Sequence, residues 1–224
     1  MEKKDVVAAV TALKDSDKRK FPQSYELIIN IKNIDLKNQQ NQLDYFLTLP
    51  KSTSRPVKVC ALVGGELKVF AEAACDKVIP LDEFPKYEGN KKALKKLTEE
   101  YDYFIAQATI MPQVAKVFGR VFGPRGKMPN PKAGCVVPPN ANLKPLVEKL
   151  QRTIRTQSRK SYCLQCIVGK ESLSSEDLVE NIFSLYNQVL HLLPQEKNNV
   201  KNVLLKKTMG KPVKVGATVE EVAA

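Results

Sequence analysis

The chain has 224 residues, of which 43% are hydrophobic, and its 36 Lys and Arg outnumber its 24 Asp and Glu to give a formal net charge of +12. This length and hydrophobic content suffice for one large packed domain or two small ones, so a chain disordered throughout is excluded. The positive charge favours a nucleic acid or an acidic membrane as partner over a small neutral substrate.

The chain shows no sequence signal for membrane insertion or secretion. Its first residues are mostly charged, and no apolar stretch approaches the length that spans a bilayer. An odd number of cysteines in a chain with an ample core argues against a disulfide framework. We therefore expect a soluble, cytoplasmic protein with no membrane partner and with free thiols at Cys60, Cys75, Cys135, Cys163 and Cys166.

The first fifty residues predict one helix and two strands. Apolar residues at positions 6, 7, 10 and 13 share one face of a helix that we expect to end near Asp15. From Ser24 to Ile31 the pattern alternates, with Tyr, Leu and Ile at the odd positions, which is typical of a strand with one core face. A second strand is expected over residues 43–49, before Pro50.

The middle of the chain predicts alternating strands and helices. Strands are expected over residues 57–63, 77–79 and 103–107, and helices over 66–74, 90–102, 112–118 and 143–152. Such units imply a small parallel sheet with helices on its faces. Residues 119–142 are rich in glycine and proline, yet they also hold Phe, Val and Met, so we expect an ordered functional loop without regular structure.

The last part of the chain predicts a strand, a helix and two basic strands. The strand includes residues 162–168, and Ser174 followed by Asp177 is typical of a helix start. Apolar residues then recur at helical spacing from Leu178 to Leu192. Residues 197–219 carry six lysines and no acid, and the aliphatic residues between these lysines predict a pair of strands.

This order of elements predicts two domains and a mixed α/β and α+β fold. Each flanking piece lacks enough elements to cover a core alone. We therefore expect the two pieces, residues 1–54 and 155–224, to join into one discontinuous α+β domain. Residues 55–154 would form an α/β domain inserted into it.

Thr208, Met209, Gly210 and Lys211 lie between the two basic strands. Glycine lets a backbone approach a partner closely, a threonine hydroxyl both donates and accepts, and methionine offers a pliable apolar contact. This combination inside a basic segment favours a polyanion that has sugars and bases to contact.

A second basic region covers residues 103–170, where twelve Lys and Arg occur and Glu148 is the only acid. Solvated helical faces usually mix both signs, so a long window of one sign favours polyanion binding. Phe21 follows the basic residues 18–20 at the entrance to the first strand. Two interpretations of this ring stay open, contact with a ribose or base and packing of the first helix onto the sheet.

The motifs that suggest catalysis or a metal do not match their patterns. Around Gly126-Lys127 the glycine spacing of a phosphate loop is wrong, and Met128 stands where that motif needs Ser or Thr. Cys163 and Cys166 have the spacing of half a zinc site, but a strand would point them to opposite faces. We expect no catalytic residue, metal or cofactor, and no enzyme.

Three stretches carry a resemblance to a known family. The strongest is residues 119–132, G-R-V-F-G-P-R-G-K-M-P-N-P-K, and the others are Lys20-Phe21 with Ser24 and Glu26, and Thr208-Met209-Gly210. They are similar to the universal large-subunit ribosomal protein L one, the protein of the mobile stalk beside the exit site. The resemblance covers essentially the whole chain, and residues 138–143 look archaeal in style. Lys211 is a departure, since many members have proline directly after the glycine.

The resemblance implies a discontinuous α+β domain that binds RNA and an inserted Rossmann-like, three-layer α/β domain. It implies contacts with stalk ribosomal RNA from Lys20, Phe21, Ser24, Glu26, Asn30, Lys206, Lys207, Thr208, Met209 and Gly210. A basic residue occurs in some relatives where this chain has Asn30. For the loop, secondary contacts to RNA or tRNA and a purely structural role both remain open for Arg120, Arg125, Lys127 and Lys132.

The function implied by the resemblance is that of a structural ribosomal protein. It would bind 23S-type ribosomal RNA to form the stalk, assist release of deacylated tRNA from the exit site, and repress translation of its own mRNA. Outside the ribosome it would be a monomer. The alternatives are a non-specific RNA-binding protein, whose affinity falls steeply with salt for every RNA, and a nucleotide-binding enzyme that uses the inserted block.

Overall fold

The computed structural model describes residues 2–15, 19–35, 42–158 and 161–216. The chain divides into two compact units, which are Met1–Arg55 with Arg152–Ala224, and Pro56–Gln151. We call them unit 1 and unit 2. The second division lies three residues before the one expected at 154/155, because the strand β7 (Thr153–Ser158) already pairs with β2 (Leu43–Thr48) of unit 1.

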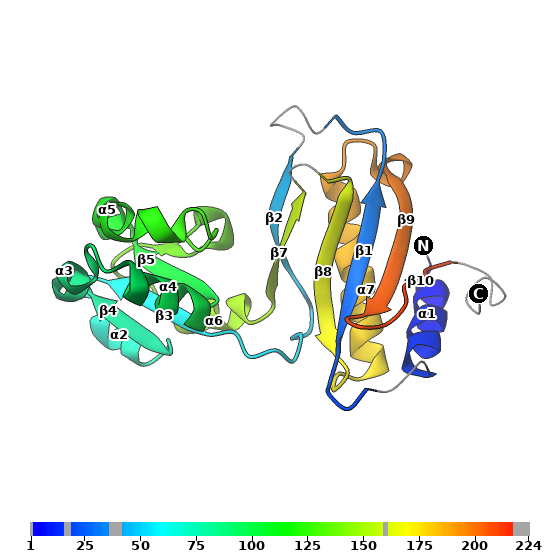
Figure 1. Cartoon of the computed structure of the whole chain (residues 1–224), viewed down its shortest axis with the longest axis horizontal. Coiled ribbons are helices and arrows are strands. Elements are labelled where there is room, and N and C mark those ends of the chain that lie inside the picture. Colours follow the sequence, from blue (N-terminus) through cyan, green and yellow to red (C-terminus); the bar gives the residue numbers. More distant parts are fainter. Residues whose placement is uncertain (1, 16–18, 36–41, 159–160, 217–224) are drawn as a thin grey trace. The chain divides into compact units, whose positions relative to one another are not determined.

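Unit 1 is built on a four-stranded antiparallel sheet with β1 as an inner strand (Figure 1). One neighbour of β1 comes from the middle of the chain and the other from its end, so the N-terminal and C-terminal pieces share one sheet. The strand order is β10 (Val213–Lys214), β9 (Val200–Lys207), β1 (Ser24–Ile31) and β8 (Cys163–Lys170), and β2 and β7 form a separate antiparallel pair.

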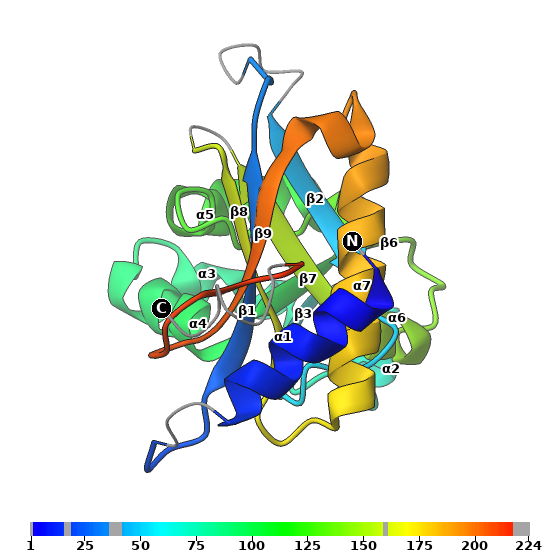
Figure 2. The same cartoon turned by 90° about the vertical axis from the view of Figure 1, so that its right-hand side faces the viewer.

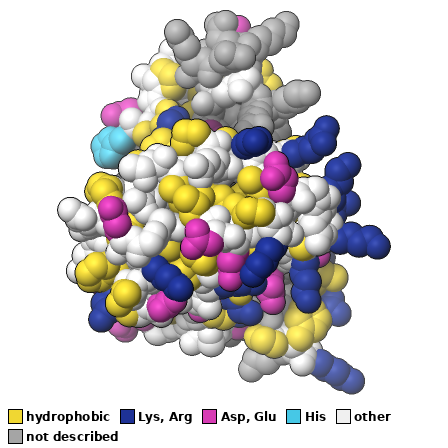
Figure 3. Space-filling view, turned by 90° about the vertical axis from the view of Figure 1, so that its left-hand side faces the viewer, with side chains coloured by type: hydrophobic (Ala, Val, Ile, Leu, Met, Phe, Trp, Pro, Cys, Tyr) yellow, Lys and Arg dark blue, Asp and Glu magenta, His cyan; other side chains and the backbone are white. Residues whose placement is uncertain are grey.

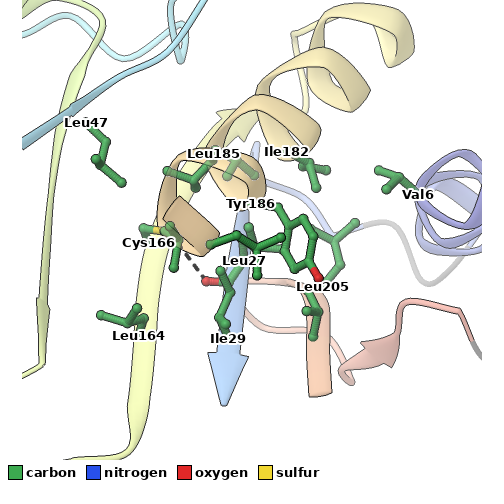
Figure 4. Packing of buried hydrophobic residues seen from close by; sticks show 14 of the residues in the cluster. Val6, Leu27, Ile29, Leu47, Leu164, Cys166, Ile182, Leu185, Tyr186 and Leu205 are labelled. Carbon is green, nitrogen blue, oxygen red and sulfur yellow. Dashed lines mark hydrogen bonds between the residues drawn. The ribbon is translucent and has the colours of Figure 1, made fainter. Parts of the chain in front are cut away.

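The helices α1 (Lys3–Asp15) and α7 (Ser175–Leu192) cover one face of this sheet (Figure 2). The odd residues of β1 point toward them, so Leu27 and Ile29 are fully buried together with Ile182 and Leu185 of α7 (Figure 4). The Ser174 hydroxyl accepts from the N–H of Asp177 at 3.1 Å and caps α7, as the sequence predicts. The even residues of β1 lie on the other, open face.

Unit 2 contains a parallel sheet with strand order β4 (Lys77–Pro80), β3 (Val59–Val63), β5 (Tyr103–Gln107) and β6 (Val136–Val137). Its core includes an aromatic cluster in which Phe122 lies 4.3 Å from Phe104 and 5.2 Å from Phe118 between ring centroids. The mixed fold class predicted from the sequence is confirmed. The helices of this unit are α2 (Lys68–Glu72), α3 (Phe84–Tyr87), α4 (Lys91–Glu100), α5 (Met111–Phe122) and α6 (Lys144–Leu150).

One prediction about these elements was wrong, and one strand was missed. The helix expected over 112–118 continues to Phe122, and a turn of 3₁₀ helix and the strand β6 follow within the segment expected to be irregular. Val114, Phe118 and Phe122 are spaced by four and share the buried face of α5, which outweighs the helix-breaking tendency of Gly119. The strand β7 was not predicted, because its short polar sequence pairs with a strand about 110 residues earlier.

Candidate nucleic-acid interface

Three strand ends meet at one end of the unit 1 sheet. β1 begins at Ser24, which is paired with Lys170, the last residue of β8, and Tyr25 is paired with Lys207, the last residue of β9. The segments that enter β1 and leave β9 therefore lie side by side, at the lower end of the sheet in Figure 1. This places the stretch containing Lys20 and Phe21 next to residues 208–210, which we call the 208–210 turn.

Backbone hydrogen bonds fix the 208–210 turn to the start of β1. The N–H of Thr208 donates to the carbonyl oxygen of Ser24 at 3.0 Å, and its hydroxyl donates to the same oxygen at 3.2 Å. The N–H of Gly210 donates to the carbonyl of Lys207 at 2.9 Å and closes the turn. A Cβ on Gly210 would lie 3.3 Å from the Cβ of Lys207, so the absence of a side chain permits this close return.

Two large apolar side chains project from this end of the sheet. Met209 is 63% exposed and Phe21 is 49% exposed. Of the two interpretations of Phe21, this exposure favours contact with a ribose or base, and the residues of the core under α1 and α7 do not include Phe21. Exposed apolar groups beside hydroxyls and lysines are suited to contact both bases and sugars.

The open face of the sheet continues from this end. Glu26 is paired across strands with Lys206, and its Oε2 accepts from Nε2 of Gln165 at 2.7 Å. Asn30 lies four residues further along β1, about 13 Å away at the rise of a strand, and donates to Asn202 at 2.7 Å. The structure thus brings Glu26 and Lys206 close to the turn but places Asn30 apart from it.

Lys207 requires a correction. It was expected to be a surface contact, but it is only 2% exposed, and its Nζ lies 3.4 Å from Oε1 of Glu171. The alternation of β9 explains this, because Lys206 falls on the open face and Lys207 on the core face. Lys207 therefore neutralises a carboxylate inside the protein, and Lys206 is the lysine that faces outward.

Gln23 and Glu171 complete the support of the turn, and sequence reasoning missed both. Oε1 of Gln23 accepts from the N–H of Met209 at 3.0 Å, and the N–H of Gln23 donates to Oε2 of Glu171 at 2.9 Å. Gln23 is buried. The only available signal was their position at the ends of two predicted strands, and the pairing of those strands could not be read from the sequence.

The loop of unit 2 uses two of its four predicted basic residues internally. The guanidinium of Arg125 donates to the carbonyl of Lys95 and to Glu99, both on α4. Nζ of Lys127 donates to the carbonyls of Tyr101 and Asp102 at 3.1 and 3.0 Å. The bonds of Lys127 satisfy carbonyls directly after the last residue of α4, where positive charge is favourable. The contacts of Arg125 and Lys127 therefore support a structural role over contact with RNA or tRNA.

Arg120 and Lys132 are exposed, as Arg125 also is, but Arg125 and Lys127 are held by hydrogen bonds to residues on and after α4. The face seen in Figure 3 carries many Lys and Arg side chains, together with hydrophobic and acidic ones. Arg120 lies in the last turn of α5 and Lys132 in the 3₁₀ turn Pro131–Ala133, so the four predicted residues do not share one role.

Gly119 lies inside α5 and Gly123 directly follows this helix, so the two glycines test how glycine shapes the end of α5. A Cβ at Gly123 would lie 2.8 Å from the carbonyl oxygen of Gly119, whereas a Cβ at Gly119 would meet no atom within 4 Å. We expect Gly123→Ala to destabilise unit 2 by about 1–3 kcal/mol through this clash. Gly119→Ala, the matched control inside the helix, should stabilise it by about 0.5–1 kcal/mol. Urea unfolding of both variants measures the difference, and equal shifts of the midpoint would contradict the account.

The five cysteines carry no sign of nucleophilic chemistry. All five are free thiols. Burial raises the pKa of Cys60 and Cys166 to about 12 and that of Cys75 and Cys135 to about 11, so these thiols stay protonated at neutral pH.

Within the described parts of the chain, no group of three or more His, Cys, Asp and Glu could hold a metal ion. The helices that the structure describes include none long and apolar enough to cross a membrane.

Comparison with known proteins connects this geometry to a family. A model of the ribosomal protein L1p/L10e family matches residues 13–211. Among the similar proteins, each called large ribosomal subunit protein uL1, that of Thermoplasma volcanium is 38% identical over 217 residues, which are 96% of this chain and 98% of the relative. That of Methanothermococcus thermolithotrophicus is 39% identical over 216 residues, or 96% and 99%. That of Nanoarchaeum equitans is 38% identical over 213 residues, or 93% and 98%.

These matches confirm the resemblance, including its archaeal style. The family comprises structural proteins of the large ribosomal subunit, which act in translation and are not enzymes, so the expectation of a non-enzymatic ribosomal protein is confirmed by the relatives. Its place is the ribosome in the cytoplasm. The match spans both units and includes the loop and the 208–210 turn. The chain belongs to the ribosomal protein L1p/L10e family.

Proposed function

We propose that the end of the unit 1 sheet around the 208–210 turn binds the stalk region of large-subunit ribosomal RNA directly. The observation that carries the proposal is the exposure of Met209 and Phe21 on a turn and an entry segment that hydrogen bonds hold in place. Large apolar side chains exposed on a fixed surface mark an interaction site. The lysines around them favour a polyanion as the partner.

Each residue type at this surface suits one part of an RNA. Lys20 and Lys206 lie where they can neutralise phosphates, which supplies affinity without sequence information. The Thr208 hydroxyl donates to Ser24 and keeps lone pairs that can accept from a ribose 2′-hydroxyl. Met209 and Phe21 provide apolar area for a base or sugar.

Glu26 is the residue that favours specific recognition over simple attraction. A carboxylate is repelled by phosphate, so a surface selected only for charge would not carry one beside Lys206. One oxygen of Glu26 already accepts from Gln165, and the carboxylate retains capacity to accept from a base N–H or a ribose hydroxyl. The proposal therefore includes discrimination between folded RNAs.

The test compares two RNAs across a salt series. The full chain is titrated with a stalk ribosomal RNA fragment and with a scrambled RNA of equal length between 50 and roughly 500 mM salt. We expect a preference for the stalk RNA of about a hundredfold or more that survives high salt, because contacts to bases and sugars release few counterions. Equal affinities that fall together with salt would replace the proposal with non-specific RNA binding.

We further propose that unit 2 contacts tRNA leaving the exit site. The exposed Arg120 and Lys132 support this, since Arg125 and Lys127 are engaged within the loop. Crosslinking of deacylated tRNA to ribosomes that carry Arg120→Gln and Lys132→Gln tests it. A crosslink yield equal to that of the unmodified ribosome would argue against contact at these residues.

Repression of the protein's own mRNA is a third proposal and uses the same surface. An mRNA segment that folds like the stalk RNA would present its sugars and phosphates to the 208–210 turn in the same way. Competition between the two RNAs for the chain is therefore expected, and simultaneous binding of both would exclude a shared site. We also propose that the free protein is a monomer, which sedimentation without RNA tests.

A further inference from the structure

A buried polar cluster lies directly beneath the 208–210 turn and joins three segments that are far apart in the sequence. It consists of Gln23, which precedes β1, Glu171, which follows β8, and Lys207, the last residue of β9. We call these three residues the Gln23 cluster. Oε1 of Glu171 lies 3.4 Å from Nζ of Lys207, and its Oε2 accepts from the N–H of Gln23 at 2.9 Å. The main-chain N–H of Glu171 donates to the carbonyl of Gln23 at 3.0 Å.

The cluster reaches the proposed RNA surface at two points. The side-chain oxygen of Gln23 accepts from the N–H of Met209 at 3.0 Å, so the backbone of Met209 is held inward while its side chain is 63% exposed. Gln23 also lies two residues after Phe21, the other exposed apolar residue. Gln23 is thus bonded to the backbone of Met209, and it anchors the chain two residues after Phe21.

The burial of the cluster makes it sensitive to the loss of any member. Gln23 and Lys207 are each only 2% exposed, whereas the side chain of Glu171 is 26% exposed and so partly buried. A buried charge requires an opposite charge nearby, and a buried amide requires hydrogen-bond partners. Both requirements are met here only when the ends of β1, β8 and β9 have come together. The cluster therefore acts as a rigid support. Burying an ion pair costs desolvation free energy that hydrophobic packing would not, so the use of charged residues here suggests a role beyond stability.

We propose that Gln23, Glu171 and Lys207 are positioning residues, which hold the 208–210 turn and Phe21 in the RNA-binding arrangement before RNA arrives. The inference rests on the proposed function. A surface that is already ordered loses less conformational entropy when it binds, so its affinity and its selectivity are higher than those of a mobile turn. None of the three residues needs to touch RNA for this effect.

A double-mutant cycle separates positioning from folding. The proteins are the wild type, Glu171→Gln, Lys207→Met and the double variant, which has the net charge of the wild type. Glu171→Gln leaves the buried Lys207 without its charged partner, and Lys207→Met leaves the partly buried Glu171 without its partner, so each should lower the melting temperature. The double variant removes both charges and should recover most of that loss, because a buried ion pair can often be replaced without loss of stability.

RNA binding is expected to behave differently from the melting temperature in this cycle. The double variant should still bind the stalk RNA about tenfold more weakly than the wild type, the order expected from one lost hydrogen-bonded support, with unchanged affinity for scrambled RNA. A double variant that binds stalk RNA within twofold of the wild type would overturn the proposal. So would stalk RNA affinities that simply follow melting temperature across the four proteins.

Gln23→Met provides a second test that creates no buried charge. It removes the acceptor for the Met209 N–H and keeps the Glu171–Lys207 pair. We expect about a tenfold loss of stalk RNA affinity with a melting temperature near that of the wild type, and full affinity would overturn the proposal. If the wild type itself shows no preference for stalk RNA, the proposed function fails, whereas a preference that all these variants retain removes only the positioning role.

Discussion

Replacement of both Thr208 and Met209 by alanine is expected to weaken stalk RNA binding by about 30-fold to 100-fold while leaving the affinity for scrambled RNA nearly unchanged. The threonine hydroxyl contributes about 1 kcal/mol as a hydrogen-bond partner, and burial of the methionine against RNA contributes about 1–2 kcal/mol. Neither side chain is charged, so the change removes no counterion release. Fluorescence titration at two salt concentrations measures both affinities.

Lys206→Met is the matched control for this double variant. Lys206 lies on the open face of β9 two residues before Thr208, and its loss removes a charge with little change of shape. It should weaken binding to both RNAs by similar factors and reduce the salt slope by about one. If the double variant and this control behaved alike, the division between recognition by the 208–210 turn and attraction by lysine would be wrong.

Truncation of Phe122 to alanine is expected to destabilise unit 2 by about 3–5 kcal/mol and to leave RNA binding largely intact. The ring is fully buried in the aromatic cluster with Phe104 and Phe118, and the loss leaves a cavity in that core. The core of unit 1 consists of a separate set of residues. Calorimetry should show two unfolding transitions, of which only that of unit 2 moves to lower temperature. Titration should show stalk RNA affinity within about threefold of the wild type.

The control for Phe122→Ala is Val121→Ala on the same helix. Val121 is only partly buried against that core, so its truncation should cost about 1 kcal/mol. A single unfolding transition that shifts as a whole in Phe122→Ala would show that the two units fold as one. Loss of stalk RNA binding together with that shift would assign part of the interface to unit 2.

The sequence was sufficient for those elements whose pattern is local. The alternation of β1 identified which side chains face outward, and Ser174 with Asp177 marked the start of α7. The 208–210 turn was predicted between two basic strands, and β9 and β10 flank it. In each case a few consecutive residues contain the physical cause of the structure, which is the alternation of side chains along a strand or the capping of a helix.

The sequence was insufficient where the cause lies in pairing between distant segments. Lys206 and Lys207 look alike as neighbours, and only the register of β9 against β1 decides which of them is buried. The bond from Met209 to Gln23 joins residues 186 positions apart, and the ion pair between Lys207 and Glu171 depends on the same strand order. The sequence placed Arg125 and Lys127 in one set with Arg120 and Lys132 as possible RNA or tRNA contacts. The hydrogen-bond partners of Arg125 and Lys127, on α4 and directly after it, could not be predicted from the sequence.

The position of β9 beside β1 has a consequence for how this protein enters an assembly. During synthesis Phe21 and Ser24 are made long before Thr208 and Met209, since the hydrogen bond between Thr208 and Ser24 joins residues 184 positions apart. A fragment that stops before Val200 keeps β8 beside β1 but lacks β9 and the 208–210 turn, and therefore lacks that part of the surface. We therefore expect the proposed stalk RNA to bind fragments that stop before Val200 more weakly than the whole chain.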